Sequence, residues 1–332
     1  MQKSLLLAAA SAFAALVAGS GCGKLETTGT IEGGPLEPQV VATRAAALAA
    51  TSSALAEKGG AGSEPKQILF GDLHVHTTFS TDAFMMSLPI LQGDGAHPVA
   101  DACDYARYCS GLDFWSINDH AESITPRRWR ETKETIRRCN ELAGDPANPD
   151  LVSFLGWEWT QIGLTPDDHY GHKNVILAGT AEDEVPRRAI HSDSFAFRAM
   201  RTPPNSLQRF AMPLLDWPNR QRYFDMLAAQ DEVRGVPLCP AGVDTRELPE
   251  QCLEGAATPE ILYEKLSQWG FDSIVIPHGN TWGLYTPAGS TWDKQLKGRL
   301  HDPEKQTLIE VFSGHGNSEE YRQWRAAKTG EG

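Results

Sequence analysis

The chain has 332 residues and a formal net charge of −13. This length is enough for one large domain, or two small ones, with a hydrophobic core. A chain this acidic is a poor candidate for binding nucleic acid or an anionic membrane surface, so we exclude both as expected partners. The charge is no obstacle to binding cations.

The N-terminus has the pattern of an export signal. Lys3 gives it a basic start, and residues 5–17 form an apolar run that is too short to span a membrane comfortably. Residues 19–22, Gly-Ser-Gly-Cys, resemble a lipoprotein cleavage box, although Gly19 stands where such boxes usually carry leucine. We expect a lipoprotein-type signal peptide over residues 1–22 and a location in the periplasm or cell envelope, with a lipid anchor on Cys22. Simple cleavage and secretion is the alternative.

The next segment, residues 23–65, has few aromatic residues and many Gly, Ala, Thr and Ser residues. This composition predicts a flexible tether, with a transient helix over residues 45–56. Residues 66–332 are expected to form the folded domain.

Five cysteines remain after Cys22, and none has a Cys-x-x-Cys spacing, so a zinc knuckle is not expected. An oxidising compartment favours disulfides instead. Cys239 and Cys252 flank a loop and are the first choice for a pair. A second pair is expected from two of Cys103, Cys109 and Cys139, which leaves one free thiol.

The domain alternates between predicted strands and helices. The apolar runs that predict strands lie at residues 67–75, 112–117, 151–155, 174–177, 272–277 and 307–312. Helices are predicted over 98–110, over about 126–142 with Pro126 at the first position, and over 259–270 with Gly at the end. This alternation predicts an α/β sheet or barrel with parallel strands and crossover helices. Residues 179–258 break the rhythm and are predicted to be a long irregular insertion, partly helical around 218–229.

Imidazoles and carboxylates cluster at the ends of these predicted strands. His74 and His76 occupy positions i and i+2 of the first strand, so their side chains project in the same direction. Other candidate ligands at or near strand ends are Asp82, His120, Glu158, His172 and His278. Such residues are poorly suited to burial without partners, which favours a shared metal site over core packing. Two satisfied histidines on one strand end would be the alternative for His74 and His76 alone.

Mixed imidazole and carboxylate ligands suit zinc, manganese or iron. More than four candidate ligands imply more than one ion, and Glu158 could bridge two of them. Clustered metals serve hydrolysis, because they lower the pKa of a bound water and neutralise charge on a displaced group.

The order His-x-His with a following Asp, then Asp-His, then Glu, then separate His residues resembles the PHP (polymerase and histidinol phosphatase) superfamily. The stretches Phe-Gly-Asp-Leu-His-Val-His-Thr-Thr-Phe-Ser-Thr-Asp at 70–82, Trp-Glu-Trp-Thr at 157–160, Gly-His-Lys-Asn-Val-Ile at 171–176 and Ser-Gly-His-Gly-Asn-Ser-Glu at 313–319 are similar to the domain-of-unknown-function 3604 family. The resemblance covers residue 67 to the end. It implies a distorted (β/α)7 barrel, two or three divalent ions and phosphoesterase-like chemistry.

The resemblance also implies how the ligands are shared. The first ion would take His74, His76 and Glu158; the second Glu158, His172 and His278; and the third Asp82 and His120. His169 competes with His172, which is preferred because it immediately precedes a strand. Asp119 is expected to orient a ligand, and His315 to act as an acid or phosphate-binding group, or else to be structural.

One part of the PHP pattern is absent. No Asp-x-His follows His315, and a seventh strand is missing from the sequence. Either the chain is a C-terminally incomplete fragment, which we expect, or the motif has been lost. The first and third sites would then each lack one ligand.

The leading functional hypothesis is an exported metal-dependent hydrolase of a phosphate ester or similar small anionic ester. An amidohydrolase-type enzyme acting on C–N or carboxyl-ester bonds also places His-x-His on its first strand. A catalytically incomplete metal-binding domain is the non-enzymatic alternative. The Asp-His pair at residues 119–120 and the expected bridging of two ions by Glu158 favour the first hypothesis.

Overall fold

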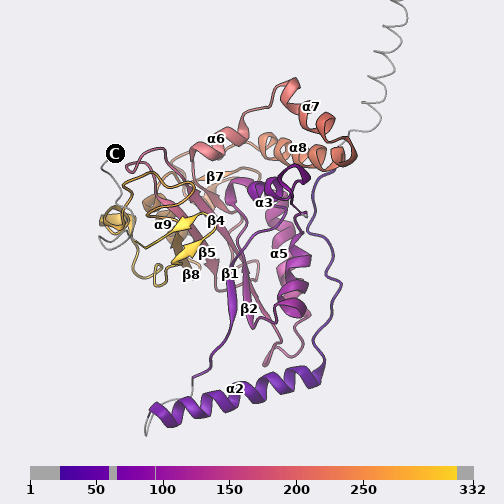
Figure 1. The fold of residues 1–332 in the computed structure, drawn as a ribbon. Coiled ribbons are helices and arrows are strands. Elements are labelled where there is room, and N and C mark those ends of the chain that lie inside the picture. The colour runs from indigo at the N-terminus through magenta and orange to yellow at the C-terminus, as the bar shows by residue number, and fades with distance from the viewer. Residues whose placement is uncertain (1–22, 60–65, 94, 320–332) are drawn as a thin grey trace, which may run out of the picture.

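The computed structural model describes residues 23–59, 66–93 and 95–319. The predicted signal peptide and Cys22 lie outside these residues. Two three-stranded sheets lie side by side at the centre of the fold, and helices pack around them (Figure 1). The described residues form a mixed α/β fold with no closed barrel, so the predicted (β/α)7 barrel is not confirmed.

The first sheet agrees with the predicted parallel arrangement. Its strands are β1 (Gly71–Val75), β2 (Phe114–Ile117) and β3 (Val152–Phe154), paired in parallel in that order. The crossovers contain α3 (Thr81–Met86), α4 (Val99–Asp104) with a π-helical turn at Tyr105–Cys109, and α5 (Pro126–Glu141). Pro126 takes the first position of α5, as predicted, and Thr125 caps this helix by accepting a hydrogen bond from the Arg128 N–H.

The second sheet contradicts the prediction of parallel pairing throughout. Its strands β4 (Gly156–Gln161), β5 (Gly171–Leu177) and β8 (Ser273–His278) are antiparallel. The chain turns directly from β4 into β5, and a direct reversal needs no crossover helix. Gly156 lies where the chain passes from the first sheet to the second. A Cβ at this position would come within 2.5 Å of the Val175 carbonyl oxygen, so only glycine fits.

The last predicted strand is also wrong in its extent. Within 307–312 only Phe312 belongs to a strand, the short β9 (Phe312–Ser313), which pairs with β10 (Gly316–Asn317). The preceding residues instead run beside β8, held by backbone hydrogen bonds from Val275 to Lys305 (2.9 Å) and from Glu310 to Pro277 (3.2 Å). This contact brings Glu310 to the end of β8.

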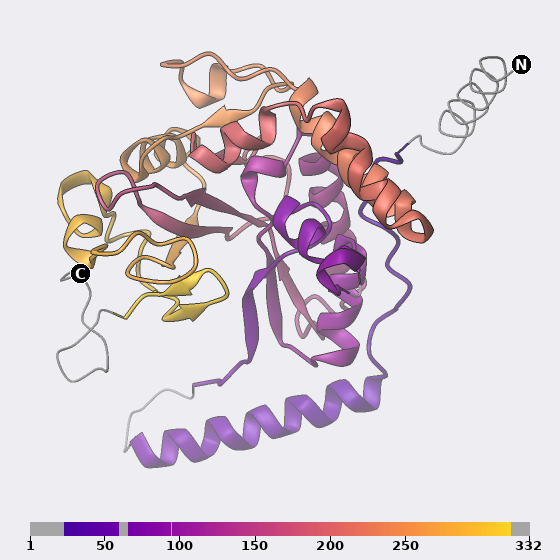
Figure 2. The same cartoon turned by 45° about the horizontal axis from the view of Figure 1, so that its top comes forward.

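The predicted insertion forms a separate helical layer. It contains β6 (Ile190–His191), α6 (Phe195–Arg201), α7 (Ser206–Leu215), α8 (Arg220–Gly235) and β7 (Glu254–Gly255). Both views place α6, α7 and α8 over one end of the two sheets, with the long helix α2 (Pro38–Gly59) at the opposite end (Figures 1 and 2). The C-terminal half adds α9 (Pro259–Trp269), ended by left-handed Gly270 as predicted, and the short α10 (Trp292–Gln295).

The main core lies between the first sheet, α5 and the second sheet. Four fully buried tryptophans dominate it: Trp115, Trp129, Trp157 and Trp159. Three of their indole N–H groups donate hydrogen bonds to protein oxygens, including Trp159 to the Ala256 carbonyl at 2.8 Å. Large aromatic surfaces with satisfied polar edges are the usual means of stabilising such a core.

The segment expected to be a tether differs from that expectation. Its first part lies against the domain, because the Glu32 N–H donates to Asp104, the Leu36 N–H donates to Asp150 (2.6 Å) and Ile31 packs on the core. The helix expected at 45–56 is the longer α2. Among the described helices, none is long and apolar enough to cross a membrane.

The cysteines pair as the sequence indicated. Cys239 is bonded to Cys252, as predicted, and the second disulfide joins Cys103 to Cys139. Of the five cysteines that the structure describes, Cys109 is the one with a free thiol, and it is exposed. The Cys103–Cys139 bond links α4 to α5 inside the core. Two disulfides are typical of proteins that fold in an oxidising compartment.

We expect the double substitution Cys103→Ser and Cys139→Ser to lower the free energy of unfolding by about 4 kcal/mol, because the bond closes a loop of 36 residues in the unfolded chain. Urea unfolding followed by circular dichroism measures this change. Cys109→Ser is the matched control and is expected to unfold like the parent protein. Equal stability of the double variant and the control would contradict the prediction.

Candidate metal centre

Nine histidine and carboxylate side chains converge at one end of the two sheets. They are the seven predicted ligands, His74, His76, Asp82, His120, Glu158, His172 and His278, together with Glu310 and His315. We call them the histidine–carboxylate cluster. Their backbones come from both sheets, from α3 and from the segments that flank β9, so only the folded chain assembles them.

Glu158 lies at the centre of the cluster on β4 and is completely buried. Its Oε2 atom is 3.2 Å from His74 Nε2 and 3.0 Å from His76 Nε2, and these two nitrogens are 2.9 Å apart. The predicted projection of both imidazoles from the end of the first strand is therefore confirmed. The first predicted ligand set is brought together as one group.

The other carboxylate oxygen, Glu158 Oε1, faces a second group. It is 2.5 Å from His172 Nδ1, 3.4 Å from His278 Nε2 and 3.6 Å from His120 Nδ1. The antiparallel register explains this arrangement. His172 pairs with Thr160, which lies two residues after Glu158 on the same face of β4, and His278 pairs with His172 on the next strand. Cross-strand partners have neighbouring side chains, which places both imidazoles beside Glu158.

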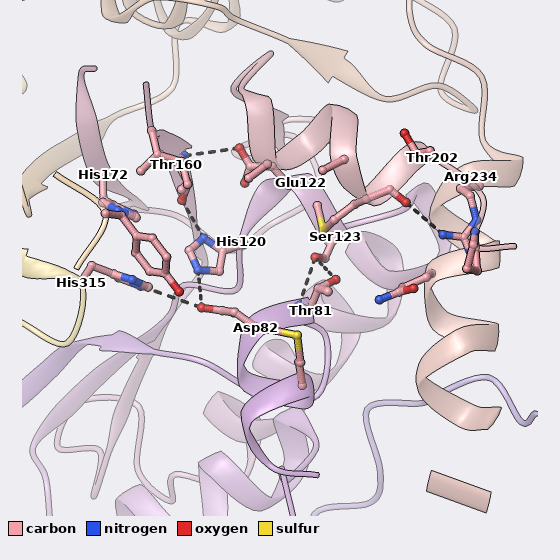
Figure 3. Close-up of a pocket in the computed structure, with 18 residues that line it drawn as sticks. Thr81, Asp82, His120, Glu122, Ser123, Thr160, His172, Thr202, Arg234 and His315 are labelled. Carbon is pink, nitrogen blue, oxygen red and sulfur yellow. Dashed lines mark hydrogen bonds and ion pairs between the residues drawn. The ribbon is translucent and has the colours of Figure 1, made fainter. Parts of the chain in front are cut away.

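A third group lies towards α3. His120 Nε2 is 2.9 Å from Asp82 Oδ2, and His120 Nδ1 is 2.6 Å from the Thr160 hydroxyl (Figure 3). Asp82 stands in the first turn of α3, where the helix dipole favours a negative charge. His315 Nε2 approaches the same carboxylate at 4.0 Å. The two predicted ligands of the third set are thus in contact.

Sequence reasoning missed Glu310 as a site residue. Its Oε2 atom is 2.8 Å from His74 Nδ1 and 3.7 Å from His278 Nδ1. The available signal was its place inside an apolar run, where an isolated carboxylate needs a partner. With His74 and His278 it forms a further group of donor atoms able to hold an ion.

His315 belongs to the cluster, but its predicted role in catalysis stays a prediction. Its ring stacks on His172 with centroids 4.3 Å apart, and it lies close enough to His74, His76 and Glu158 to share an ion with them. The competing residue His169 lies outside these groups, and its Nε2 atom is 3.4 Å from the Gly279 carbonyl oxygen.

Asp119 does not face the cluster directly. Its carboxylate accepts hydrogen bonds from the Thr77 N–H (2.6 Å), the Thr77 hydroxyl (2.8 Å) and the Ser80 hydroxyl (3.0 Å). Ser80 in turn contacts His76 Nδ1 at 2.8 Å. Asp119 can therefore orient His76 through Ser80, which is how outer groups commonly fix a ligating imidazole.

The carboxylates control the protonation of the imidazoles when no ion is bound. Burial opposes protonation of His74, but its bonds to Glu158 and Glu310 outweigh burial and raise its pKa to about 10. His120, also buried, has its pKa raised to about 10 by Glu158 and Asp82. Burial would raise the pKa of Glu158, but the surrounding imidazoles hold it well below the usual value. The carboxylate is thus ionised and ready to ligate a cation.

The cluster fits a metal centre by its donor set. Burial leaves His172 Nε2 and both ring nitrogens of His278 without a hydrogen-bond partner among the described protein groups, although Glu158 lies nearby. The described residues form four overlapping groups, and within each group the three or four donor atoms lie within 4.8 Å of one another. Imidazole and carboxylate donors in this number suit zinc, manganese or iron.

Metal binding is expected to depend on pH in a defined direction. At pH 7 the pKa values of about 10 leave His74 and His120 protonated without an ion, and an ion must displace a proton from each imidazole that it binds. We expect the affinity for Zn²⁺ to rise by about tenfold per pH unit for each proton displaced, up to that pKa. Competition with a chelator across pH 7 to 9 measures this slope. An affinity that does not change with pH would contradict the assignment.

A cavity of about 380 Å³ opens beside the cluster. His120, Asp82, His172 and His315 form one wall, and the insertion helices α6 and α8 supply part of the opposite wall (Figure 3). The fold and this site together define a mixed α/β protein with a histidine–carboxylate cluster at the base of a cavity.

Residues 63–143 match the family model described as protein of unknown function (DUF3604). The matched stretch contains β1, α3, α4, β2 and α5, and it includes His74, His76, Asp82 and His120. This similarity supports the resemblance to that family and assigns no activity. No curated protein and no solved structure matches the chain.

Proposed function

We propose that the protein is a metal-dependent hydrolase of a phosphate ester or similar anionic ester. The observation that carries the proposal is the position of Glu158, whose two carboxylate oxygens face two different histidine groups. A carboxylate placed in this way is suited to bridge two cations. Paired divalent ions supply an activated water and neutralise charge on the displaced group.

The residues of the chain have distinct tasks in this proposal. His74 and His76 would hold one ion on the Oε2 side of Glu158, and His172 and His278 would hold a second on the Oε1 side. Asp82 and His120 would contribute ligands to a third ion, next to the cavity. Asp119 fixes the orientation of His76 through Ser80. Ligands that are held by hydrogen bonds in this way would keep the reacting groups in place.

The location that we propose is the cell envelope, with export directed by the N-terminal segment and a lipid anchor on Cys22. The two disulfides support export, because such bonds persist in oxidising compartments. Membership of the PHP superfamily is likewise part of the proposal, supported by the order of the ligands along the chain.

The double substitution His74→Ala and His76→Ala tests the site. Removing two of the donors on the Oε2 side is expected to lower the bound metal by one ion per chain and to abolish turnover of phosphate, sulfate and carboxyl esters. Elemental analysis and an ester screen on purified protein measure both. His97→Ala is the matched control, because the His97 side chain is 72% exposed and forms an ion pair with Asp101 outside the cluster.

The outcomes separate the competing functions. Unchanged metal content in the double variant would refute the site assignment. Stoichiometric metal in the parent protein, with no turnover of any ester, would favour a metal-binding domain without activity. Turnover of carboxyl esters or amides, with none of phosphate or sulfate esters, would favour the amidohydrolase-type alternative.

A further inference from the structure

We propose that the cavity beside the cluster is a specificity pocket for an apolar organic group of the substrate, and that Glu122 recognises a hydrogen-bond donor on that group. The inference rests on the proposed function, because it places the anionic part of the same substrate at the histidine–carboxylate cluster. It adds a substrate class: an anionic ester with an apolar substituent that carries a hydroxyl, amine or amide N–H.

The position of the cavity sets what can enter it. Its inner wall is formed by Asp82, His120, His172 and His315, which are the members of the cluster nearest the insertion (Figure 3). A substrate group bound at the cluster from this side therefore has its substituent directed into the cavity. The volume of about 380 Å³ is within the range of pockets that hold small organic molecules.

The remaining lining is largely apolar. It includes Met85 on α3, Ile162 after β4, Tyr285, and residues in and after α6: Ala196, Met200 and Pro204. Burying a hydrocarbon group against such side chains is favourable by about 25 cal/mol per Å². A strongly polar substituent would lose water here, and only a group that reaches one of the few polar side chains, such as Glu122, would regain a partner.

A second anionic group on the substituent would find no free counter-charge. Among the described residues that line the cavity, Arg234 is the only arginine or lysine. Its guanidinium already donates to Asp231 Oδ1 (2.6 Å) and to the Met200 carbonyl oxygen (3.0 Å). The anionic part of a substrate is therefore directed to the cluster and away from the far wall.

Glu122 supplies the polar feature of the pocket. This residue lines the cavity and is 3% exposed. Its Oε1 atom accepts hydrogen bonds from the Ser192 N–H (3.0 Å) and hydroxyl (2.7 Å), whereas Oε2 has no hydrogen-bond partner within residues 23–59, 66–93 and 95–319. A buried carboxylate oxygen without a donor is costly, and a donor on a bound ligand would remove that cost.

Binding of three phosphonates to the metal-loaded full-length protein tests the pocket by calorimetry. Methylphosphonate probes the cluster alone, benzylphosphonate adds the apolar group, and 4-(aminomethyl)benzylphosphonate adds a donor. We expect benzylphosphonate to bind at least about tenfold more tightly than methylphosphonate, because a hydrophobic pocket gains about this much from even one methylene group. The aminomethyl compound is expected to gain about another tenfold through Glu122.

Two variants separate the two parts of the proposal. Ala199→Phe on α6 fills the cavity and is expected to remove the preference for benzylphosphonate while leaving methylphosphonate binding unchanged. Ala49→Phe, at an exposed position of α2, is the matched control. Glu122→Gln places an amide N–H where the unpaired oxygen lies, and is expected to remove only the gain from the aminomethyl group.

Failure of the pocket can be told apart from failure of the proposed function. Intact methylphosphonate binding and ester turnover, with no preference for benzylphosphonate or no effect of Ala199→Phe, would overturn the pocket alone. An aminomethyl gain that survives Glu122→Gln would overturn the role of Glu122. Absence of binding by all three phosphonates would overturn both proposals.

Discussion

Glu158→Gln is expected to lower ester turnover by more than about 100-fold, the upper end of the effect seen for groups that only orient a ligand. The amide keeps the shape of the side chain but removes the charge shared by the two histidine groups. It presents an N–H to one of these groups, where a cation would have to bind. Metal content is expected to fall by at least one ion per chain, measured by elemental analysis on the same preparation.

The same substitution has a second signature in the protein without metal. His120 owes its raised pKa first to Glu158, and His74 also depends on this carboxylate, so both values are expected to fall towards the ordinary value for histidine. Titration followed by NMR of the imidazole protons measures this shift. Glu134→Gln, at an exposed position of α5, is the control. Turnover and metal content equal to those of the control would refute the central role of Glu158.

Arg107→Ala is expected to lower the free energy of unfolding by about 3–5 kcal/mol, a large loss for a single substitution. Arg107 and Asp150 form an ion pair at 3.1 Å, and their side chains are 0% and 1% exposed. The guanidinium also donates to the Cys139 carbonyl oxygen at 3.0 Å. Removing it leaves a buried carboxylate without its counter-charge, which costs more than the pair itself contributes.

Urea unfolding of Arg107→Ala measures the loss. Arg130→Ala, at an exposed position of α5, is the control and is expected to change stability by less than about 0.5 kcal/mol. Combining Arg107→Ala with Asp150→Ala is expected to cost less than the sum of the two single changes, because no isolated charge remains. Additive losses would show that the two residues act independently.

The sequence determined the local features and the types of ligand. The apolar runs fixed the positions of β1, β2, β3, β5 and β8, and the alternating pattern predicted the parallel first sheet correctly. The i, i+2 spacing of His74 and His76 was sufficient to place both side chains on one side of β1. Pro126 and Gly270 marked a helix start and a helix end through backbone geometry alone. Local information sufficed because each feature depends on neighbouring residues.

The tertiary structure alone decided which distant residues meet. The antiparallel second sheet was missed because hydrophobic runs give no strand direction, yet its register places His172 and His278 beside Glu158. Glu310 joined the site only through the backbone contact of its segment with β8. The irregular insertion gave no signal that α6 would face the cluster across a cavity. These pairings depend on packing between residues that are far apart in the sequence. No short stretch of the chain contains the information that predicts them.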